Sequence, residues 1–284
     1  MNNRKEKIMQ LVFLAAACAS IALVAMICCF LFANGLPTIG KIGISEFLLG
    51  EKWRPNNDIY GILPMIMGSL YVTLGACITG VPIGILTAIF MARFCPVSIY
   101  KYLKPAVELL AGIPSVIYGF FGLVVMVTFI RDNFGGTGSS MLTASLLLGM
   151  MILPTLISVA EAALRAVPDS YYEGALALGA GHVRRVFFTV VPAAKSGIMA
   201  AIILGVGRAI GETMAVIMVA GNQARMPQGL LEGVRTMTTN IVIEMGYAAD
   251  LHRDALIATA VVLFIFIMLI NLTFSYLKGK VVQQ

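Results

Sequence analysis

Six long apolar runs limit what this chain can fold into. Polar stretches separate the runs, and each run reaches the roughly 20 residues that a helix needs to cross a bilayer. We place the spans at 8–33, 63–91, 105–130, 141–160, 196–220 and 255–277. The composition agrees, because 59% of the 284 residues are hydrophobic and 12% are charged, whereas soluble domains are about half apolar and roughly a quarter charged. The sequence therefore predicts an all-α, polytopic membrane protein with six transmembrane helices.

The distribution of Lys and Arg predicts the orientation of these spans. Twelve of the twenty basic residues fall near the two termini and in the loops after the second and fourth spans, and seven fall in the other loops. Positive charge marks the cytoplasmic side of a membrane protein, so we expect both termini in the cytoplasm. The first run, 8–33, is long enough to span and has no small-x-small cleavage site at its end, so we expect it to remain as a helix.

Neither a metal site nor a nucleotide site is expected on this chain. The five cysteines lie in apolar runs or beside Arg93, without the spacing of metal ligands or of a disulfide framework. The stretch GLPTIGKI, 35–42, fits G-x-x-x-x-G-K, but Ile42 stands where Ser or Thr would hold magnesium. This stretch also falls on the outer side, away from cytoplasmic ATP. Any use of ATP would therefore require a partner.

The fifth span carries an arginine and a glutamate, in GVGRAIGETMAV. In a continuous helix, Arg208 and Glu212 lie four residues apart on one face. Gly207 and Gly211 form a GxxxG pair, like Gly80 and Gly84 in the second span, and such pairs let two helix backbones approach closely. Two interpretations stay open: an intramembrane ion pair that fixes helix packing, or an arginine that binds an anion on its way across the membrane.

Four hydroxyl residues are further candidates for a pathway through the membrane. Ser69 and Thr73 lie in the second span, Ser115 in the third and Thr213 in the fifth. Hydroxyls in such spans also commonly bond a carbonyl of the preceding turn, which is the structural alternative for each of them. Pro114 is expected to interrupt the third span just before Ser115.

The cytoplasmic loop 161–195 looks structured and is longer than a simple connection. Ser170 and Glu173 have the spacing of a capping box, which predicts a short helix from Glu173 to about Leu178. A second, basic helix is expected over 182–192. A long, structured and partly apolar loop in the cytosol favours a docking surface.

At this loop the chain resembles the membrane subunits of ATP-binding-cassette importers. Their EAA motif reads roughly E-A-A-x-x-x-G, then nine residues, then I-x-L-P. Glu173, Gly174, Ala175, Gly179 and Pro192 fall in register with it, although glycine replaces the first alanine, and threonine and valine precede the proline. The resemblance implies a coupling helix that sits in a cleft of a cytoplasmic ATPase. It also implies that ATP and magnesium bind to that ATPase, and that this chain is a non-catalytic subunit.

Three further stretches are similar to the membrane subunits of Pst-type phosphate importers. They cover 51–73, 112–123 and 207–216, where W-x-P followed by YGILP, together with ETMAV, points to the PstC-like member of the two permeases. The resemblance implies a MetI-like permease fold in the bacterial inner membrane. We then divide the chain into 1–62, with the first transmembrane helix and first outer loop, and 63–284, the permease core with its coupling loop.

The implied function is that of a permease subunit in an ATP-driven phosphate importer, forming half of the pathway. The implied partners are a PstA-like second permease, a cytoplasmic ATPase dimer and an external phosphate-binding protein. In this setting, Arg208 would alternate between Glu212 and phosphate. Trp53 and Tyr60 are expected to anchor the first outer loop at the membrane interface.

Other functions remain open at this stage. Residue chemistry indicates an anion, and only the resemblance indicates phosphate, so molybdate or sulfate are alternative substrates. A stand-alone secondary anion transporter is an alternative from another class, but such proteins commonly show an inverted repeat, which we do not find. A membrane scaffold without transport is a third possibility.

Overall fold

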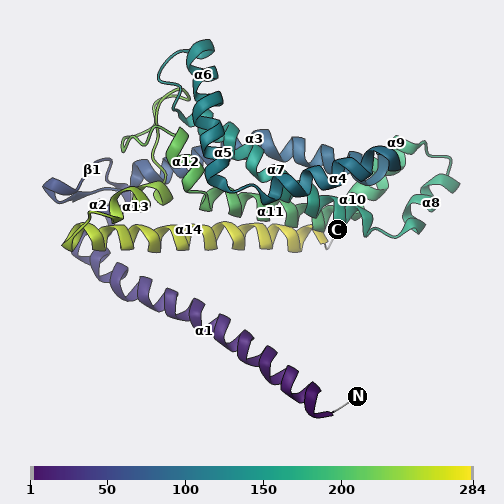
Figure 1. Cartoon of the computed structure of the whole chain (residues 1–284), viewed down its shortest axis with the longest axis horizontal. Helices are drawn as coiled ribbons and strands as arrows, with labels where there is room; N and C mark the ends of the chain where they lie inside the picture. Colours follow the sequence, from purple (N-terminus) through teal and green to yellow (C-terminus); the bar gives the residue numbers. More distant parts are fainter. Residues whose placement is uncertain (1–2, 283–284) are drawn as a thin grey trace.

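The apolar runs fold into helices, most of which lie along one long axis, as the computed structural model of residues 3–282 shows (Figure 1). The two expected domains, 1–62 and 63–284, extend slightly beyond the described residues, which leave out Met1, Asn2, Gln283 and Gln284. Five helical segments are long and apolar enough to cross a membrane, and a sixth candidate is bent by 70°. The predicted number of six spans is met if this bent pair counts as one span, but the pair covers 182–211, whereas the predicted fifth span is 196–220.

The membrane-spanning elements are bounded as follows. They are α1 (Asn3–Ile42), α3 (Leu63–Ile89) with a π-helical turn (Phe90–Phe94), α5 (Ser115–Phe121) continued by a π-helical turn (Gly122–Met126) and α6 (Val127–Phe134), α7 (Met141–Arg165), and α14 (Asp250–Val282). The bent sixth candidate joins α9 (His182–Arg185), a π-helical turn (Val186–Val190) and α10 (Val191–Ala193) to α11 (Lys195–Gly211).

Shorter elements complete the chain at both ends of the bundle. They are α2 (Ile44–Leu49), β1 (Trp53–Arg54), a 3-10 turn (Pro55–Asn57), β2 (Ile59–Tyr60), α4 (Val97–Gly112), α8 (Asp169–Ala177), α12 (Met214–Val219) and α13 (Met237–Met245). The two strands pair antiparallel, with Trp53 opposite Tyr60.

The core forms where α7 packs against α3 and α11. A Cβ atom on Gly80 would lie 2.7 Å from the Gly149 carbonyl oxygen, and one on Gly84 would lie 2.9 Å from the Leu156 Cβ. The first GxxxG pair therefore does bring two helices close, as predicted. The second pair does not: a Cβ on Gly207 or Gly211 would meet nothing within 4 Å among the described residues.

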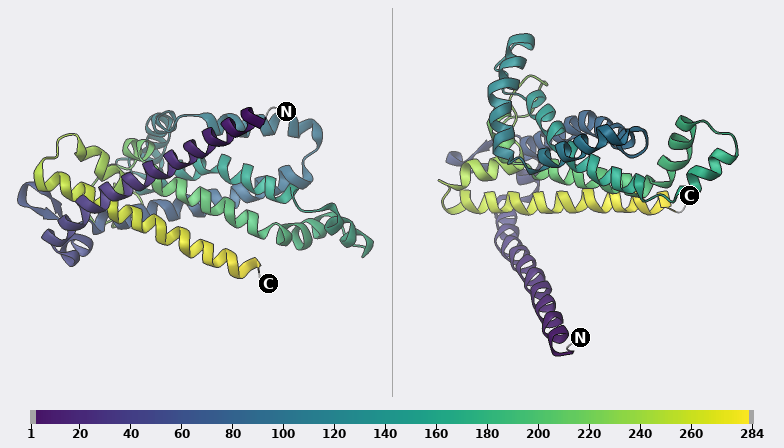
Figure 2. Two further views of the ribbon diagram at one scale, coloured as in Figure 1. Left: turned by 90° about the horizontal axis from the view of Figure 1, so that it is seen from below. Right: turned by 45° about the vertical axis from the view of Figure 1, so that its right-hand side comes forward.

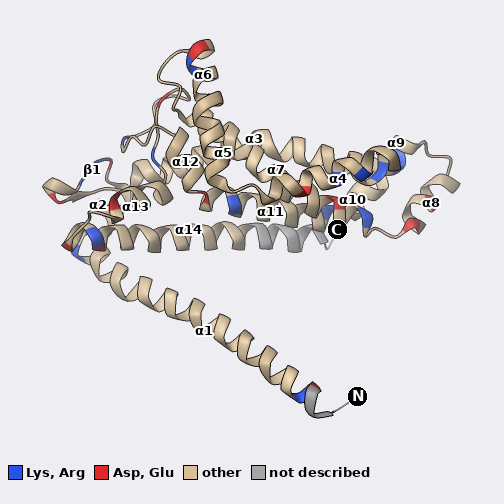
Figure 3. Ribbon diagram, viewed as in Figure 1, with Lys and Arg blue, Asp and Glu red and all other residues tan. Residues whose placement is uncertain are grey.

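The two chain ends and α8 lie toward the same end of the molecule (Figures 1 and 2). The strands, α2 and α13 lie toward the opposite end. Lys and Arg concentrate on and near α9, at the α8 end (Figure 3). This arrangement agrees with the predicted orientation, in which the α8 end is cytoplasmic.

The third predicted span, 105–130, is two helices. Pro114 interrupts the run as expected, and the break leaves α4 and α5 on either side of Ile113. Helix α4 begins at Val97, well before the predicted span, and the stretch that is long and apolar enough to cross the membrane is Ser115–Phe134. The span therefore lies further along the chain than its hydropathy suggested.

The prediction that Trp53 and Tyr60 anchor the outer loop in the membrane interface is wrong. Their side chains are 6% and 2% exposed, and their rings meet edge to face at 5.6 Å between centroids. They form an outer core with Phe47, Ile62 and Met237. The stretch GLPTIGKI is the helical end of α1 and has no loop that could cradle a phosphate.

Helix α1 touches the rest of the bundle through its second half only. The Phe32 and Phe264 rings meet at 5.8 Å between centroids, and a Cβ on Gly35 would lie 2.6 Å from the Val261 side chain. The earlier turns of α1 diverge from α14 (Figure 1) and are exposed within the chain from Glu6 on.

Candidate functional site

Arg208 lies in the last turn of α11 and is exposed within this chain. Its Nη1 donates to the Thr155 hydroxyl of α7 at 3.3 Å. No carboxylate of the described residues forms an ion pair with it. Sequence reasoning missed Thr155, although a hydroxyl directly after Pro154 in an apolar span was a signal for a polar contact.

Glu212 does not lie on a continuous helix with Arg208. Helix α11 ends at Gly211, and Glu212 has the extended backbone angles φ −68° and ψ 132°. The Glu212 carboxylate accepts the Ala215 N–H at 3.2 Å, which caps the start of α12. The predicted same-face ion pair is therefore wrong for this structure.

The break at Glu212 is stabilised from a distant part of the chain. The Thr238 hydroxyl donates to the Glu212 carbonyl oxygen at 3.1 Å. Irregular backbone inside a membrane protein persists only where neighbouring groups satisfy its hydrogen bonds. Helix α13, which carries Thr238, thus stabilises the break that divides the predicted fifth span, 196–220, into α11 and α12.

The four predicted hydroxyls occupy different surroundings. Ser69 is 3% exposed, and its hydroxyl accepts the Met237 N–H at 2.9 Å, which ties α3 to the start of α13. Thr73 is 8% exposed on the same helix. Thr213 donates to the Gly211 carbonyl oxygen at 3.2 Å, and Ser115 is half-buried at the start of α5. Within residues 3–282, no hydrogen bond joins any of the four to Arg208, so their role in a pathway stays a prediction.

The loop helix begins earlier than predicted and is not capped as predicted. Helix α8 starts at Asp169, with Pro168 at its N-cap and no side-chain cap bond, so the expected Ser170–Glu173 box is absent there. The proline ring fixes the φ angle of Pro168 near the helical value, so the helix can begin there without a capping box. Glu173 lies in the second turn and is exposed.

Gly179 ends α8 in a way that needs glycine. Its φ is +77°, and its N–H donates to the Leu176 carbonyl while the Ala180 N–H donates to the Ala175 carbonyl. This is the Schellman pattern, which favours glycine at the left-handed position. A Cβ atom added to Gly174 or Gly179 would meet no atom of the described residues within 4 Å, so this side of the loop is open in the chain.

Arg93 connects this loop to the bundle. Its guanidinium donates to the Leu164 carbonyl at 2.9 Å and the Val167 carbonyl at 3.4 Å, and it lies 3.5 Å from the Asp169 carboxylate. A cation at these carbonyls also complements the C-terminal end of the α7 dipole. Sequence reasoning counted Arg93 only as a cytoplasmic charge.

A buried carboxylate lies beneath the loop. Glu161 is 2% exposed and accepts from the Tyr100 hydroxyl at 2.6 Å, Lys104 Nζ at 3.0 Å and Arg165 Nε at 2.7 Å. Burial alone would lower the pKa of Lys104, but the hydrogen bond and charge of Glu161 outweigh it and raise that pKa. The cluster ties α4 to the cytoplasmic end of α7.

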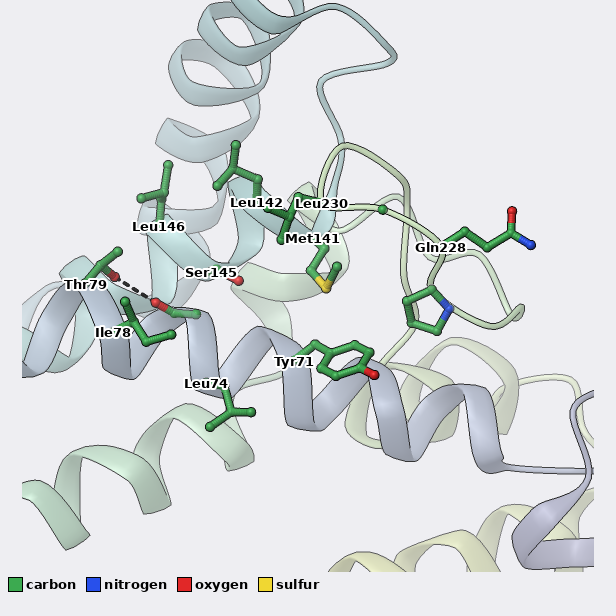
Figure 4. A pocket seen from close by; sticks show the side chains of 13 residues that line it. Tyr71, Leu74, Ile78, Thr79, Met141, Leu142, Ser145, Leu146, Gln228 and Leu230 are labelled. Carbon is green, nitrogen blue, oxygen red and sulfur yellow. Dashed lines mark hydrogen bonds between the residues drawn. The ribbon is translucent and has the colours of Figure 1, made fainter.

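The pocket in Figure 4 is unsuited to phosphate. It has a volume of about 480 Å³ and lies between α3, α7 and the segment 227–230. Its labelled side chains include hydroxyls of Tyr71, Thr79 and Ser145, but it has no charged lining residue. An unpaired anion in such a site would be strongly unfavourable. The described residues also contain no group of three or more side chains arranged to hold a metal.

Comparisons of this chain with known proteins agree on one family. Residues 80–283 match the family model of binding-protein-dependent transport system inner membrane components. The chain is 38% identical to a probable ABC transporter permease protein, YqgH, of Bacillus subtilis, over 94% of this chain and 89% of that protein. It is 33% identical to the phosphate transport system permease protein PstC of Mesorhizobium japonicum, over 94% of this chain and 88% of that protein.

A solved structure shares the fold. The inward-facing MetNI methionine ABC transporter aligns with a TM-score of 0.58 at 21% identity, covering 78% of this chain and 94% of that chain. This confirms the predicted MetI-like permease fold. With several PstC permeases among its relatives, this multi-pass chain of the cell inner membrane belongs to the family of binding-protein-dependent transport system inner membrane components, the permease subunits of ABC importers.

Proposed function

We propose that the chain is one permease subunit of an ATP-driven inorganic phosphate importer. The observation that carries this proposal is Arg208, a cation in a membrane span that is exposed within the chain and has no ion-pair partner among the described residues. An arginine in mid-membrane costs about 2.5–3.5 kcal/mol on insertion scales. Such a residue is therefore expected to face a polar pathway or a partner subunit instead of lipid.

Arginine suits phosphate at this position for chemical reasons. Its planar guanidinium remains charged when buried and can hold two phosphate oxygens at once. Thr155, at 3.3 Å from Arg208, adds a hydroxyl that phosphate oxygens accept from. One Glu212 carboxylate oxygen accepts the Ala215 N–H, which leaves acceptor positions for Arg208 if the two side chains meet during transport. The identity to PstC permeases supports phosphate over molybdate or sulfate.

The partners follow from this proposal. A PstA-like second permease completes the pathway, and an external phosphate-binding protein delivers phosphate at the outer end. A cytoplasmic ATPase dimer binds ATP and magnesium and engages α8 through Glu173, Gly174, Ala175 and Gly179, with Pro192 in the following helix. The exposed, open side of α8 supports this contact.

The test is ATP-dependent uptake of radiolabelled phosphate by the reconstituted complex, with sulfate and molybdate as competitors. Arg208→Gln is expected to abolish uptake while the complex still assembles, because the cation that offsets the phosphate charge is lost. Arg131→Gln is the matched control, since Arg131 is exposed on the outer side and paired with Asp132 at 3.1 Å. Wild-type uptake by Arg208→Gln, or competition by molybdate or sulfate at equal concentration, would contradict the proposal. Uptake by the purified chain alone without ATP would favour a secondary transporter.

A further inference from the structure

A polar pocket of about 510 Å³ opens at the outer end of the molecule. It lies between the β1–β2 hairpin, the end of α13 and the start of α14, elements that meet at that end in Figure 1. Its lining residues are Trp53, Arg54, Pro55, Asn56, Asn57, Glu244, Tyr247 and His252. None of them was singled out as a site residue by the sequence.

The acceptor at the bottom of this outer pocket is already satisfied. Glu244 is 5% exposed, and one carboxylate oxygen accepts from Trp53 Nε1 at 2.7 Å and His252 Nε2 at 2.8 Å. Its other oxygen accepts from Arg235 Nη1 at 2.5 Å. A carboxylate has about four acceptor positions, and the charge of Glu244 is balanced by Arg235. The pocket therefore offers little to an incoming donor.

The rim of the outer pocket has the opposite character. The side chains of Arg54, Asn56, Asn57 and Tyr247 are exposed and have no hydrogen-bond partner within residues 3–282. Arg54 and the two amides present donors. The Tyr247 phenol is also a donor at neutral pH, because its ordinary pKa is about 10; partial desolvation and the charge of Glu244 raise this pKa further. Unused donors around a satisfied acceptor are complementary to an anionic group.

We propose that the outer pocket is a docking site for a carboxylate side chain, Asp or Glu, on the external binding protein. This inference rests on the proposed function, because it assumes such a partner. A singly charged carboxylate bound at the rim by Arg54 and the Asn amides is repelled less by Glu244 than a doubly charged anion. Free phosphate carries up to two charges at neutral pH and would approach Glu244 in the open pocket, so the donor arrangement favours a protein carboxylate.

Hydrogen bonds connect the outer pocket to the break in the predicted fifth span. Glu244 lies on α13, and Arg235, which binds it, precedes the same helix. At its start, α13 is tied to Ser69 of α3 through Met237, and Thr238 holds the Glu212 carbonyl at the break. Displacement of α13 by a docked partner would therefore act directly on the backbone next to Arg208.

The test measures the affinity of the phosphate-loaded external binding protein for the complete transporter in lipid nanodiscs. Arg54→Ala and Asn57→Ala together are expected to raise Kd about tenfold and to flatten its dependence on salt, because a charge-assisted contact is lost. Arg253→Ala is the matched control: Arg253 is exposed on the same end but does not line the pocket, and its Kd should stay unchanged. Thermal unfolding of each complex shows that the variants are folded.

An unchanged Kd for the double variant overturns the inference. Inorganic phosphate that binds the complex without the binding protein, and is lost on Arg54→Ala, also overturns it, because the pocket would then bind free phosphate. Docking is measured directly, so intact docking with no ATP-dependent phosphate uptake would count against the proposed function and not against the pocket.

A separate variant tests whether docking acts on the break at Glu212 through α13. Thr238→Val removes the hydroxyl that holds the Glu212 carbonyl but leaves the pocket intact. It should leave Kd unchanged and lower the stimulation of ATP hydrolysis by the binding protein about fivefold, the effect of one lost hydrogen bond. Unchanged stimulation would show that docking does not act through this contact.

Discussion

Among the described residues, one buried carboxylate lies near each end of the molecule, and the side chains that donate to the two carboxylates differ in exposure. At the outer end, the Glu244 side chain is 7% exposed, and those of Arg235 and His252 are each 15% exposed. At the cytoplasmic end, Glu161 is 2% exposed, but Lys104 and Arg165 are 28% and 45% exposed. Both carboxylates accept three hydrogen bonds.

This difference separates a more buried cluster from one whose cations reach water. The outer cluster joins the hairpin, α13 and α14 through side chains that are mostly buried, where an ion left without its partner is strongly unfavourable. The cytoplasmic cluster joins α4 to α7 through cations that already reach water. Helices at the α8 end can therefore shift at lower cost, as an element that responds to ATP hydrolysis requires.

The largest expected effect is on the outer cluster. Glu244→Ala leaves Arg235 with only the neutral acceptors of Asn222 and Asn240 and no carboxylate in a largely buried site, which should lower the free energy of unfolding by about 3–5 kcal/mol. Unfolding of the detergent-solubilised protein, followed by circular dichroism, measures the loss. A loss below that of Glu161→Ala would reverse the comparison.

A smaller effect is expected at the cytoplasmic cluster. Glu161→Ala removes the acceptor of Tyr100, Lys104 and Arg165, but both cations can turn to water. The loss should therefore be about 1–3 kcal/mol, the cost of leaving hydrogen-bonding groups unpaired. The same unfolding measurement tests it, with Glu108→Ala as control, because Glu108 is 61% exposed and lies 3.7 Å from Lys104. A loss as large as that of Glu244→Ala would show that exposure of the partners does not matter here.

The features that local periodicity encodes were predictable. Apolar run length predicted the number of candidate spans and the place of most of them, the distribution of Lys and Arg agrees with the placement of α8 and the chain ends at one end of the molecule (Figure 3), and the spacing of Gly80 and Gly84 predicted the close packing of α3 on α7. The ion pair between Glu161 and Arg165 was also predictable, because the two residues are four positions apart at the end of a span.

The features that depend on long-range contacts were not predictable. Trp53 and Glu244 are 191 positions apart, so the outer cluster has no local pattern. The i,i+4 rule placed Arg208 beside Glu212 on the assumption of a continuous helix. The hydroxyl of Thr238, 26 positions away, stabilises a break that this assumption excludes.

The smallest effect on stability is expected at Gly179, where a substitution separates the stability of the chain from its coupling to the ATPase. Alanine is strained at φ +77°, so Gly179→Ala should cost about 1–2 kcal/mol. Gly136→Ala is the matched control, since Gly136 has φ +74° and a Cβ there would meet only the Leu231 carbonyl oxygen, at an ordinary 3.6 Å, but Gly136 lies in an outer loop. Both variants should lose similar stability, whereas only Gly179→Ala should reduce co-purification of the ATPase, because it alone distorts the end of α8. If equal amounts of the ATPase co-purify with both variants, Gly179 is not part of the coupling surface and serves only to end α8.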